Sequence, residues 1–205
     1  MFSESVVDML TEKYKLSRAT AELIAVRCGN SAEGAHIFVN KDTCEQRDPF
    51  MLKDMDKAVR RILKAIDNKN EVVAIYGDYD VDGVTSVSMM YLYLTSLGLR
   101  TGYYIPSRSD EGYGVNRAAI KKLHSRGVTL IITVDTGITA IEEVNYAKSL
   151  GIDIIVTDHH ECRPELPDAV AVIDPHRDDD PYPFKDFAGV GVAYKLICAV
   201  EVARC

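Results

Sequence analysis

The sequence has few cysteines, and none of them pair in a metal-binding or disulfide pattern. The five lie at positions 28, 44, 162, 198 and 205 and form no C-x-x-C motif, which argues against a zinc knuckle or a disulfide scaffold. No apolar run approaches the roughly 20 residues of a transmembrane helix. The first twenty residues also lack the long apolar stretch of a signal peptide. We therefore expect a soluble, cytoplasmic protein with no membrane partner.

Basic residues are also scarce. The chain has 24 lysines and arginines against 31 acidic residues, for a formal charge of −7. This balance argues against a protein that coats nucleic acid with a broad positive surface. Nucleic acid stays possible as a substrate, because bound metal ions can reverse the local field inside a cleft. With 205 residues, 47% of them hydrophobic, the chain suits one globular domain with a small appendage.

Residues 1–70 have the pattern of a helical segment. The stretches SESVVDMLTEKY and SRATAELIAVRCGN carry apolar residues three and four apart, and Gly29-Asn30 is a helix stop signal. A polar loop follows around NKDTCEQRDPF. The next helix has one apolar face, formed by Met51, Met55, Val59, Ile62 and Ile66.

From residue 71 the pattern changes to strands that alternate with helices. Short apolar runs predict strands within 72–80, 101–107, 128–135, 152–160 and 169–175. Helical patterns lie between and after them, at 84–97, 115–127, 139–151 and 188–203. This alternation predicts an α/β fold in residues 71–205: a doubly wound, mainly parallel sheet of about five strands, flanked by helices.

Carboxylates and imidazoles follow three of these strands. They are Asp78, Asp80 and Asp82 after the first, Asp135 after the third, and Asp158, His159 and His160 after the fourth. Taken singly, each aspartate is typical of a turn or helix cap, and the histidine pair of a solvated loop. Parallel strands, however, bring their carboxyl ends to one edge of the sheet, where ligands bind. Together these residues predict a site for manganese, magnesium or zinc.

Two other interpretations of the acidic run fit less well. DYDVDG matches the start of a calcium-binding EF-hand loop, but the twelfth loop position, where a glutamate is needed, is Met89. A strand rather than a helix also precedes the run, so we exclude this site. The phosphatase pattern D-x-D-x-T fits weakly, because its threonine position falls on Asp82 or Val84.

Several motifs resemble those of a known family. YGDYDVDG, VDTGIT and TDHHE, in this order, resemble the first three motifs of the DHH phosphoesterase superfamily. IPSRSDEGYGVN and DPHRDDDPYPFKDFAGVGVAYKL are similar to its branch of single-stranded-DNA exonucleases. The resemblance implies a catalytic DHH domain in residues 71–205, which hydrolyses phosphodiesters in the 5′-to-3′ direction with two Mn²⁺ or Mg²⁺ ions. The implied role is DNA recombination and repair.

The resemblance implies a particular metal-binding set: Asp78, Asp80, Asp82, Asp135, Asp158 and His159. Asp135 would bridge the two ions, since a carboxylate has two oxygens to share. Asp80 would bind one ion. Asp82 and His159 would bind the other.

Other residues near these motifs have less certain roles. The resemblance implies that Asp78 and Asp158 are either close ligands or acceptors that orient imidazoles. Tyr76 occupies the place of a metal-binding histidine found in other branches. Gly83, Thr85 and Ser86 open the following helix, and either ordinary capping or an anion near the helix N-terminus explains them.

The implied substrate is single-stranded DNA, with single-strand-binding protein and a helicase as further partners. His160 would face the substrate phosphate. Arg108 would grip a terminal phosphate and Tyr113 would stack on a base, although a surface arginine and a packed tyrosine are equally compatible with the sequence. Gly189 and Gly191 indicate close helix packing more than a phosphate cradle.

Two parts of the family pattern have no match in these residues. A fourth metal-binding acid in a G-x-x-A-D segment and the second domain, called DHHA1, are both missing. We therefore expect this chain alone to bind metal weakly and to cleave DNA poorly. The alternatives are another DHH enzyme (a nanoRNase, a cyclic-dinucleotide phosphodiesterase or a pyrophosphatase) and a non-catalytic replication scaffold.

Overall fold

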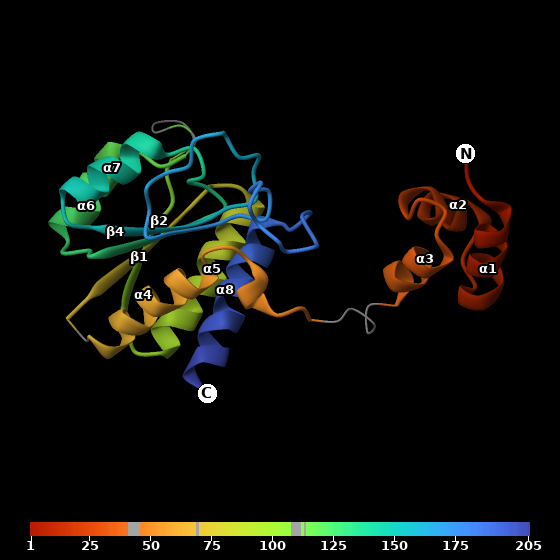
Figure 1. Ribbon diagram of the computed structural model, residues 1–205, viewed down its shortest axis with the longest axis horizontal. Helices are drawn as coiled ribbons and strands as arrows, with labels where there is room; N and C mark the ends of the chain where they lie inside the picture. Colours follow the sequence, from red (N-terminus) through yellow and green to blue (C-terminus); the bar gives the residue numbers. More distant parts are fainter. Residues whose placement is uncertain (41–45, 69, 108–111, 113) are drawn as a thin grey trace. The chain divides into compact units, whose positions relative to one another are not determined.

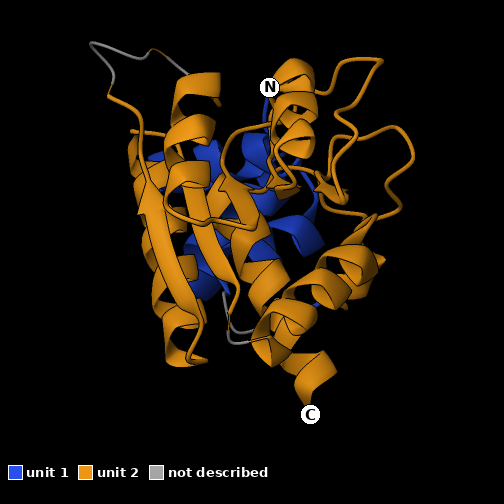
Figure 2. Ribbon diagram, turned by 90° about the vertical axis from the view of Figure 1, so that its left-hand side faces the viewer, with its two compact units in different colours: residues 1–47 blue, residues 48–205 orange. Residues whose placement is uncertain are grey.

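The structure, a computed structural model, describes residues 1–40, 46–68, 70–107, 112 and 114–205. The chain forms two compact units, Met1–Arg47 and Asp48–Cys205, which Figure 2 shows in different colours. The sequence pattern predicts a helical segment up to residue 70, but the first unit ends earlier than that boundary.

The first unit consists of three short helices: α1 (Glu4–Tyr14), α2 (Arg18–Arg27) and α3 (Ala32–Val39). Serine side chains cap two of them, since Ser17 accepts the Thr20 N–H and Ser31 accepts the Gly34 N–H. Small and aliphatic side chains fill the core, including Leu10. The first two helices agree with the sequence pattern, which did not predict α3 as a separate helix after the stop signal at Gly29-Asn30.

The second unit begins with a short 3-10 helix, η2 (Pro49–Met51), and then alternates helices and strands. Its elements in chain order are α4 (Met55–Asp67), β1 (Val72–Gly77), α5 (Val81–Ser96), β2 (Arg100–Tyr104), α6 (Arg117–Ser125), β3 (Leu130–Val134), α7 (Ile141–Ser149), β4 (Asp153–Thr157), β5 (Ala171–Ile173) and α8 (Gly189–Arg204). The predicted strands and helices are thus confirmed, with small differences at their ends.

The five strands form one sheet in the order β2-β1-β3-β4-β5, and all four pairings are parallel. The predicted parallel α/β fold is therefore confirmed. The chain leaves β1 toward β2 and then crosses back to β3, so the order reverses between β1 and β3. In open sheets of this kind, that reversal point is where ligands bind.

Helices cover both faces of the sheet (Figure 1), and alternate residues of the strands belong to the cores on opposite faces. Val73 and Ile75 of β1 pack in one core with α4, α5 and α8. Ala74 and Tyr76 pack in a second core with α6 and α7. Because both sets of alternating residues are buried, the strands appear in the sequence as unbroken apolar runs.

Helix α4 belongs to the sheet unit because its apolar face is buried there. Met55, Val59 and Ile62 are at most 3% exposed. The predicted face also included Met51, but Met51 lies in η2 and is 39% exposed. The helix starts only at Met55, after Asp54 takes a left-handed backbone conformation with φ of 62°. No helix in the described part of the chain is long and apolar enough to cross a membrane.

Candidate metal centre

Four adjacent strands each end directly before a buried aspartate. Asp78 follows β1, Asp135 follows β3, Asp158 follows β4 and Asp174 follows β5. The last residues of these strands pair in register across the sheet: Gly77 with Val134, Val134 with Thr157, and Thr157 with Ile173. The aspartates are at most 4% exposed. The sheet therefore presents a row of carboxylates at its carboxyl edge.

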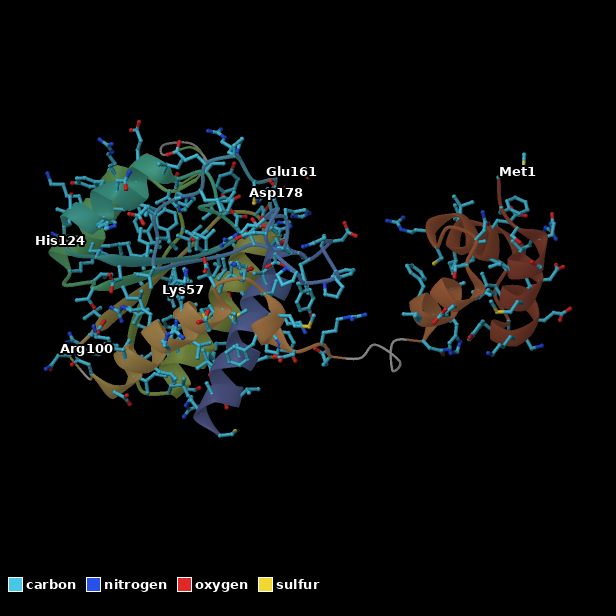
Figure 3. The ribbon with its side chains drawn as sticks, viewed as in Figure 1. Met1, Lys57, Arg100, His124, Glu161 and Asp178 are labelled. Carbon is cyan, nitrogen blue, oxygen red and sulfur yellow. The ribbon has the colours of Figure 1, made fainter. Side chains whose placement is uncertain are left out.

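Figure 3 shows which end of the sheet this is. Glu161, the residue after the histidine pair, lies toward the same end as Asp178. Arg100 and His124 lie toward the opposite end. The acidic motifs, predicted to converge beyond the strands' carboxyl ends, do so.

Asp135 lies at the centre of this edge, in an unfavourable environment for a charge. It is 2% exposed and has a positive φ of 58°, a conformation that aspartate tolerates better than most residues. Among the described residues its Oδ1 has no hydrogen-bond partner, although it lies 3.0 Å from Nε2 of His159. Burial, then the charges of Asp82 and Asp80, raises the pKa of Asp135 to about 8.

Two groups of potential ligands share Asp135. Its carboxylate, with those of Asp78 and Asp80, forms one group, and with the imidazoles of His159 and His160 it forms another. Within each group, one ligand atom per residue lies within 4.8 Å of the others. Hard oxygens with imidazole nitrogen suit Mn²⁺ and related divalent ions. The donor set, and the buried carboxylate oxygen it contains, therefore fit a pair of cations that share one ligand.

Asp80 also caps a helix. Its Oδ1 accepts the Gly83 N–H at 2.9 Å at the start of α5, so capping and membership of a ligand group coexist in one side chain. Gly83 has no room for a side chain, because a Cβ would lie 2.4 Å from the Asp78 carbonyl oxygen. This close packing fixes the turn that carries Asp78 and Asp80.

Asp158 orients the histidine pair. Its Oδ1 lies 2.7 Å from Nδ1 of His160 and accepts the His159 N–H, while Oδ2 accepts the Ile138 N–H. Burial opposes its charge, but hydrogen bonds from His160 and from Ile138 outweigh burial and lower the pKa of Asp158. The hydrogen bond to Asp158 likewise raises the pKa of His160 to about 9, against an opposing contribution from burial. Asp158 was predicted either to bind a cation or to orient an imidazole. Its contact with His160 favours the second role.

Asp82 contacts both the start of α8 and His159, its predicted partner at one ion. Its two oxygens accept the backbone N–H groups of Gly189 and Val190, at 2.6 and 2.8 Å. Its Oδ2 lies 3.6 Å from Nε2 of His159. Among the described residues, Asp82 belongs to neither ligand group.

The predicted substrate residues Arg108 and Tyr113 lie outside the described residues. The described residue Gly114 is held by Tyr76, whose hydroxyl donates to the Gly114 carbonyl oxygen at 3.0 Å. Asn116 Nδ2 donates to the same hydroxyl at 3.2 Å. Tyr76 thus connects β1 to Gly114 and to Asn116, the N-cap residue of α6.

Asp174 was not recognised from the sequence as part of this edge. It is completely buried, and its Oδ1 accepts the His176 N–H at 2.8 Å. Burial, with the nearby charge of Asp158, raises the pKa of Asp174 to about 6. Its position directly after a predicted strand, like the other three aspartates, is the signal that could have revealed it.

The raised pKa values predict that the metal-free chain loses stability as pH rises. Asp135, Asp174 and His160 have higher pKa values in the folded chain than in the unfolded chain. Their protonation therefore favours the folded state. Their titration spans the range from the ordinary aspartate value of 3.8 to about 9. Carboxyls with lowered pKa, such as Asp158, act oppositely but mainly below that range.

We expect the thermal midpoint, measured with a chelator present, to fall between about pH 5 and pH 9. The variant Asp135→Asn should show a shallower fall, since one of the three groups is removed. A midpoint that rises over this interval would contradict the assigned environments.

Comparisons with known proteins agree with this geometry. The family model described as "DHH family, N-terminal domain" matches residues 72–204. The single-stranded-DNA-specific exonuclease RecJ of Bacillus subtilis is 47% identical over 194 residues, which cover 95% of this chain and 25% of the relative. RecJ of Escherichia coli is 41% identical over 151 residues, covering 73% of this chain and 26% of the relative. The chain thus spans about a quarter of the length of these curated relatives.

Solved structures share the fold. A crystal structure of exonuclease RecJ bound to manganese has a TM-score of 0.68 and 31% identity, and the match covers 75% of this chain and 38% of that one. RecJ from Thermus thermophilus in complex with Mn²⁺ has a TM-score of 0.71 at 23% identity, covering 98% of this chain and 28% of that one, and shows the fold alone.

The predicted family is therefore confirmed by the fold, by the row of aspartates and by the match over residues 72–204. This chain belongs to the DHH family, and these residues form its N-terminal domain.

Proposed function

We propose that the chain is the catalytic part of a 5′-to-3′ single-stranded-DNA exonuclease of the RecJ type, which uses two Mn²⁺ or Mg²⁺ ions. The observation that carries this proposal is the pair of ligand groups that share Asp135. Identities of 47% and 41% to RecJ proteins support the choice of substrate. We also propose that this enzyme is soluble and cytoplasmic, and that it works with single-strand-binding protein and a helicase.

The chain's own residues hold and orient the reacting groups. Asp78 and Asp80 would hold one cation with Asp135, and Asp82 and His159 would hold the other with Asp135. Asp158 fixes the ring of His160, which faces the substrate phosphate. Cations bound here supply activation of water and charge stabilisation at the phosphoryl oxygens.

No protein nucleophile is required by this arrangement. Cys162 follows the histidine pair closely, but burial, with the charge of Asp174, raises the pKa of its thiol to about 12. A thiol that stays protonated is a poor nucleophile. Arg108 and Tyr113 complete the proposal by gripping a terminal phosphate and stacking on a base.

A substrate panel tests the proposal. The chain, in excess over substrate and with Mn²⁺, is incubated with end-labelled single-stranded DNA, a diribonucleotide, a cyclic dinucleotide and pyrophosphate. We expect slow release of mononucleotides from the 5′ end of DNA, and no release with a chelator or with Asp135→Asn. Faster cleavage of the diribonucleotide or cyclic dinucleotide would assign a different DHH enzyme. Absence of both Mn²⁺ binding and cleavage would favour the scaffold.

A further inference from the structure

The first turn of α8 is capped from a distance. Its N-cap residue, Ala188, has no side-chain oxygen, and its backbone is extended with φ of −72° and ψ of 158°. The orphan N–H groups of Gly189 and Val190 instead donate to Asp82, 107 and 108 residues earlier in the chain. One carboxylate of the acidic motif is thus engaged with the start of α8.

The same turn presses against Asp135. A Cβ on Gly189 would lie 2.6 Å from Oδ1 of Asp135, 2.7 Å from its Cβ and 2.8 Å from its Cγ. Real Cβ atoms essentially never approach other atoms this closely, so a side chain at 189 would displace one partner. The atom that this Cβ would approach most closely, Oδ1 of Asp135, is the buried oxygen that has no hydrogen-bond partner among the described residues.

Neither partner can easily move away. Asp135 is 2% exposed and fixed in a left-handed conformation between β3 and the following turn. Further along α8, the side chains of Val192, Ala193 and Leu196 are completely buried against the sheet and its neighbouring helices. A side chain at residue 189 would therefore strain the Asp135 carboxylate or the hydrogen bonds to Asp82.

We propose that Gly189 is a positioning residue of the metal centre. Its missing side chain lets the start of α8 approach closely enough to hold Asp82 by two N–H groups, and leaves Oδ1 of Asp135 free to bind a cation. This inference rests on the proposed function, because a cation is what Asp135 would hold. The start of α8 thereby holds Asp82 beside His159, whose Nε2 lies 3.6 Å from Asp82 Oδ2.

The test compares two alanine variants on one turn. Gly189→Ala and Gly191→Ala add the same methyl group to the same helix, and both favour helix formation. A Cβ on Gly191 would meet the ring of Phe187, at 2.9 Å, rather than the centre. Mn²⁺ affinity is measured by electron paramagnetic resonance of the free ion, and the thermal midpoint of each metal-free variant checks folding.

We expect Gly189→Ala to weaken Mn²⁺ binding by at least about tenfold, the scale of a disturbed ligand orientation. Gly191→Ala should stay within about threefold of the unaltered chain. Equal affinities for folded Gly189→Ala and the unaltered chain would overturn the inference and leave the proposed function standing. No Mn²⁺ binding by the unaltered chain would instead remove the proposed function.

If Gly189→Ala does not fold, a second variant, Asp82→Asn, tests the inference by amide hydrogen exchange. The metal-free variant should exchange the N–H groups of Gly189 and Val190 at least about tenfold faster than the unaltered chain, with β3 amides unchanged. Unchanged exchange at these two amides would overturn the inference without any metal present.

Discussion

Replacing Asp135 with asparagine is expected to remove Mn²⁺ binding and all metal-dependent cleavage. Both ligand groups contain Asp135, so one substitution affects both cations. Loss of a group that merely orients a ligand costs about 10–100-fold in metal affinity. Loss of a ligand common to two ions should therefore weaken binding by more than about a hundredfold.

The same substitution should make the metal-free chain more stable at alkaline pH. Burial and the charges of Asp82 and Asp80 raise the pKa of Asp135 to about 8, so its ionised form is unfavourable in the folded state. An amide of the same shape carries no charge. Asp135→Asn should accordingly raise the thermal midpoint at about pH 9 while it lowers metal affinity.

Calorimetric Mn²⁺ titration and thermal denaturation check both parts. Asp168→Asn is the control, because the Asp168 side chain is 73% exposed and pairs with Lys148 away from the acidic row. It should bind Mn²⁺ as the unaltered chain does. An Asp135→Asn variant that binds Mn²⁺ normally would contradict the assigned centre.

A second large loss, of folding stability, is expected when Arg61 is replaced at the end of the sheet opposite the carboxylate row. The side chain of Arg61 on α4 is 8% exposed. Its guanidinium donates to Glu71 at 2.7 Å, just before β1, and to Asp153 at 2.5 Å, at the start of β4. Thr129 adds a hydrogen bond to the buried Glu71 carboxylate, at 3.0 Å. This network joins α4 to the sheet.

Arg61→Met should destabilise the chain by about 3–5 kcal/mol, because it leaves a buried carboxylate without its counter-ion. Arg60→Met is the matched control on the same helix. The side chain of Arg60 is 67% exposed and pairs with exposed Asp56, so its loss should cost about 0–1 kcal/mol.

Urea denaturation followed by far-ultraviolet circular dichroism gives the free energy of unfolding of each variant. Mn²⁺ affinity of folded Arg61→Met should be unchanged, because the network lies at the end of the sheet away from the carboxylate row. Equal stabilities of the two methionine variants would show that the buried network contributes little.

The sequence was sufficient to predict the layout of the sheet and most of the centre. Strands buried on both faces give unbroken apolar runs, and parallel strands must bring Asp78, Asp135 and His159 to one edge. These rules need only local patterns and chain direction. Asp80 and Asp135 were therefore predicted near each other although 55 positions separate them.

What the sequence did not reveal depends on contacts between distant segments. The hydrogen bonds from Gly189 and Val190 to Asp82 join residues 107 and 108 positions apart, and no periodicity encodes them. Asp174 also follows a predicted strand, β5, but it was not grouped with the carboxylates that follow the other strands. Helix α4 looked like its N-terminal neighbours until the buried faces of Met55 and Ile62 placed it against the sheet.

The central claim is that carboxylates and imidazoles from separate strands jointly hold two cations around Asp135. Anomalous diffraction from crystals of the chain soaked in Mn²⁺ tests it most directly. The account predicts two anomalous peaks about 4 Å apart that both contact the Asp135 carboxylate, one near Asp80 and one near His159. Peaks only at surface carboxylates elsewhere, or no peak within reach of Asp135, would contradict it.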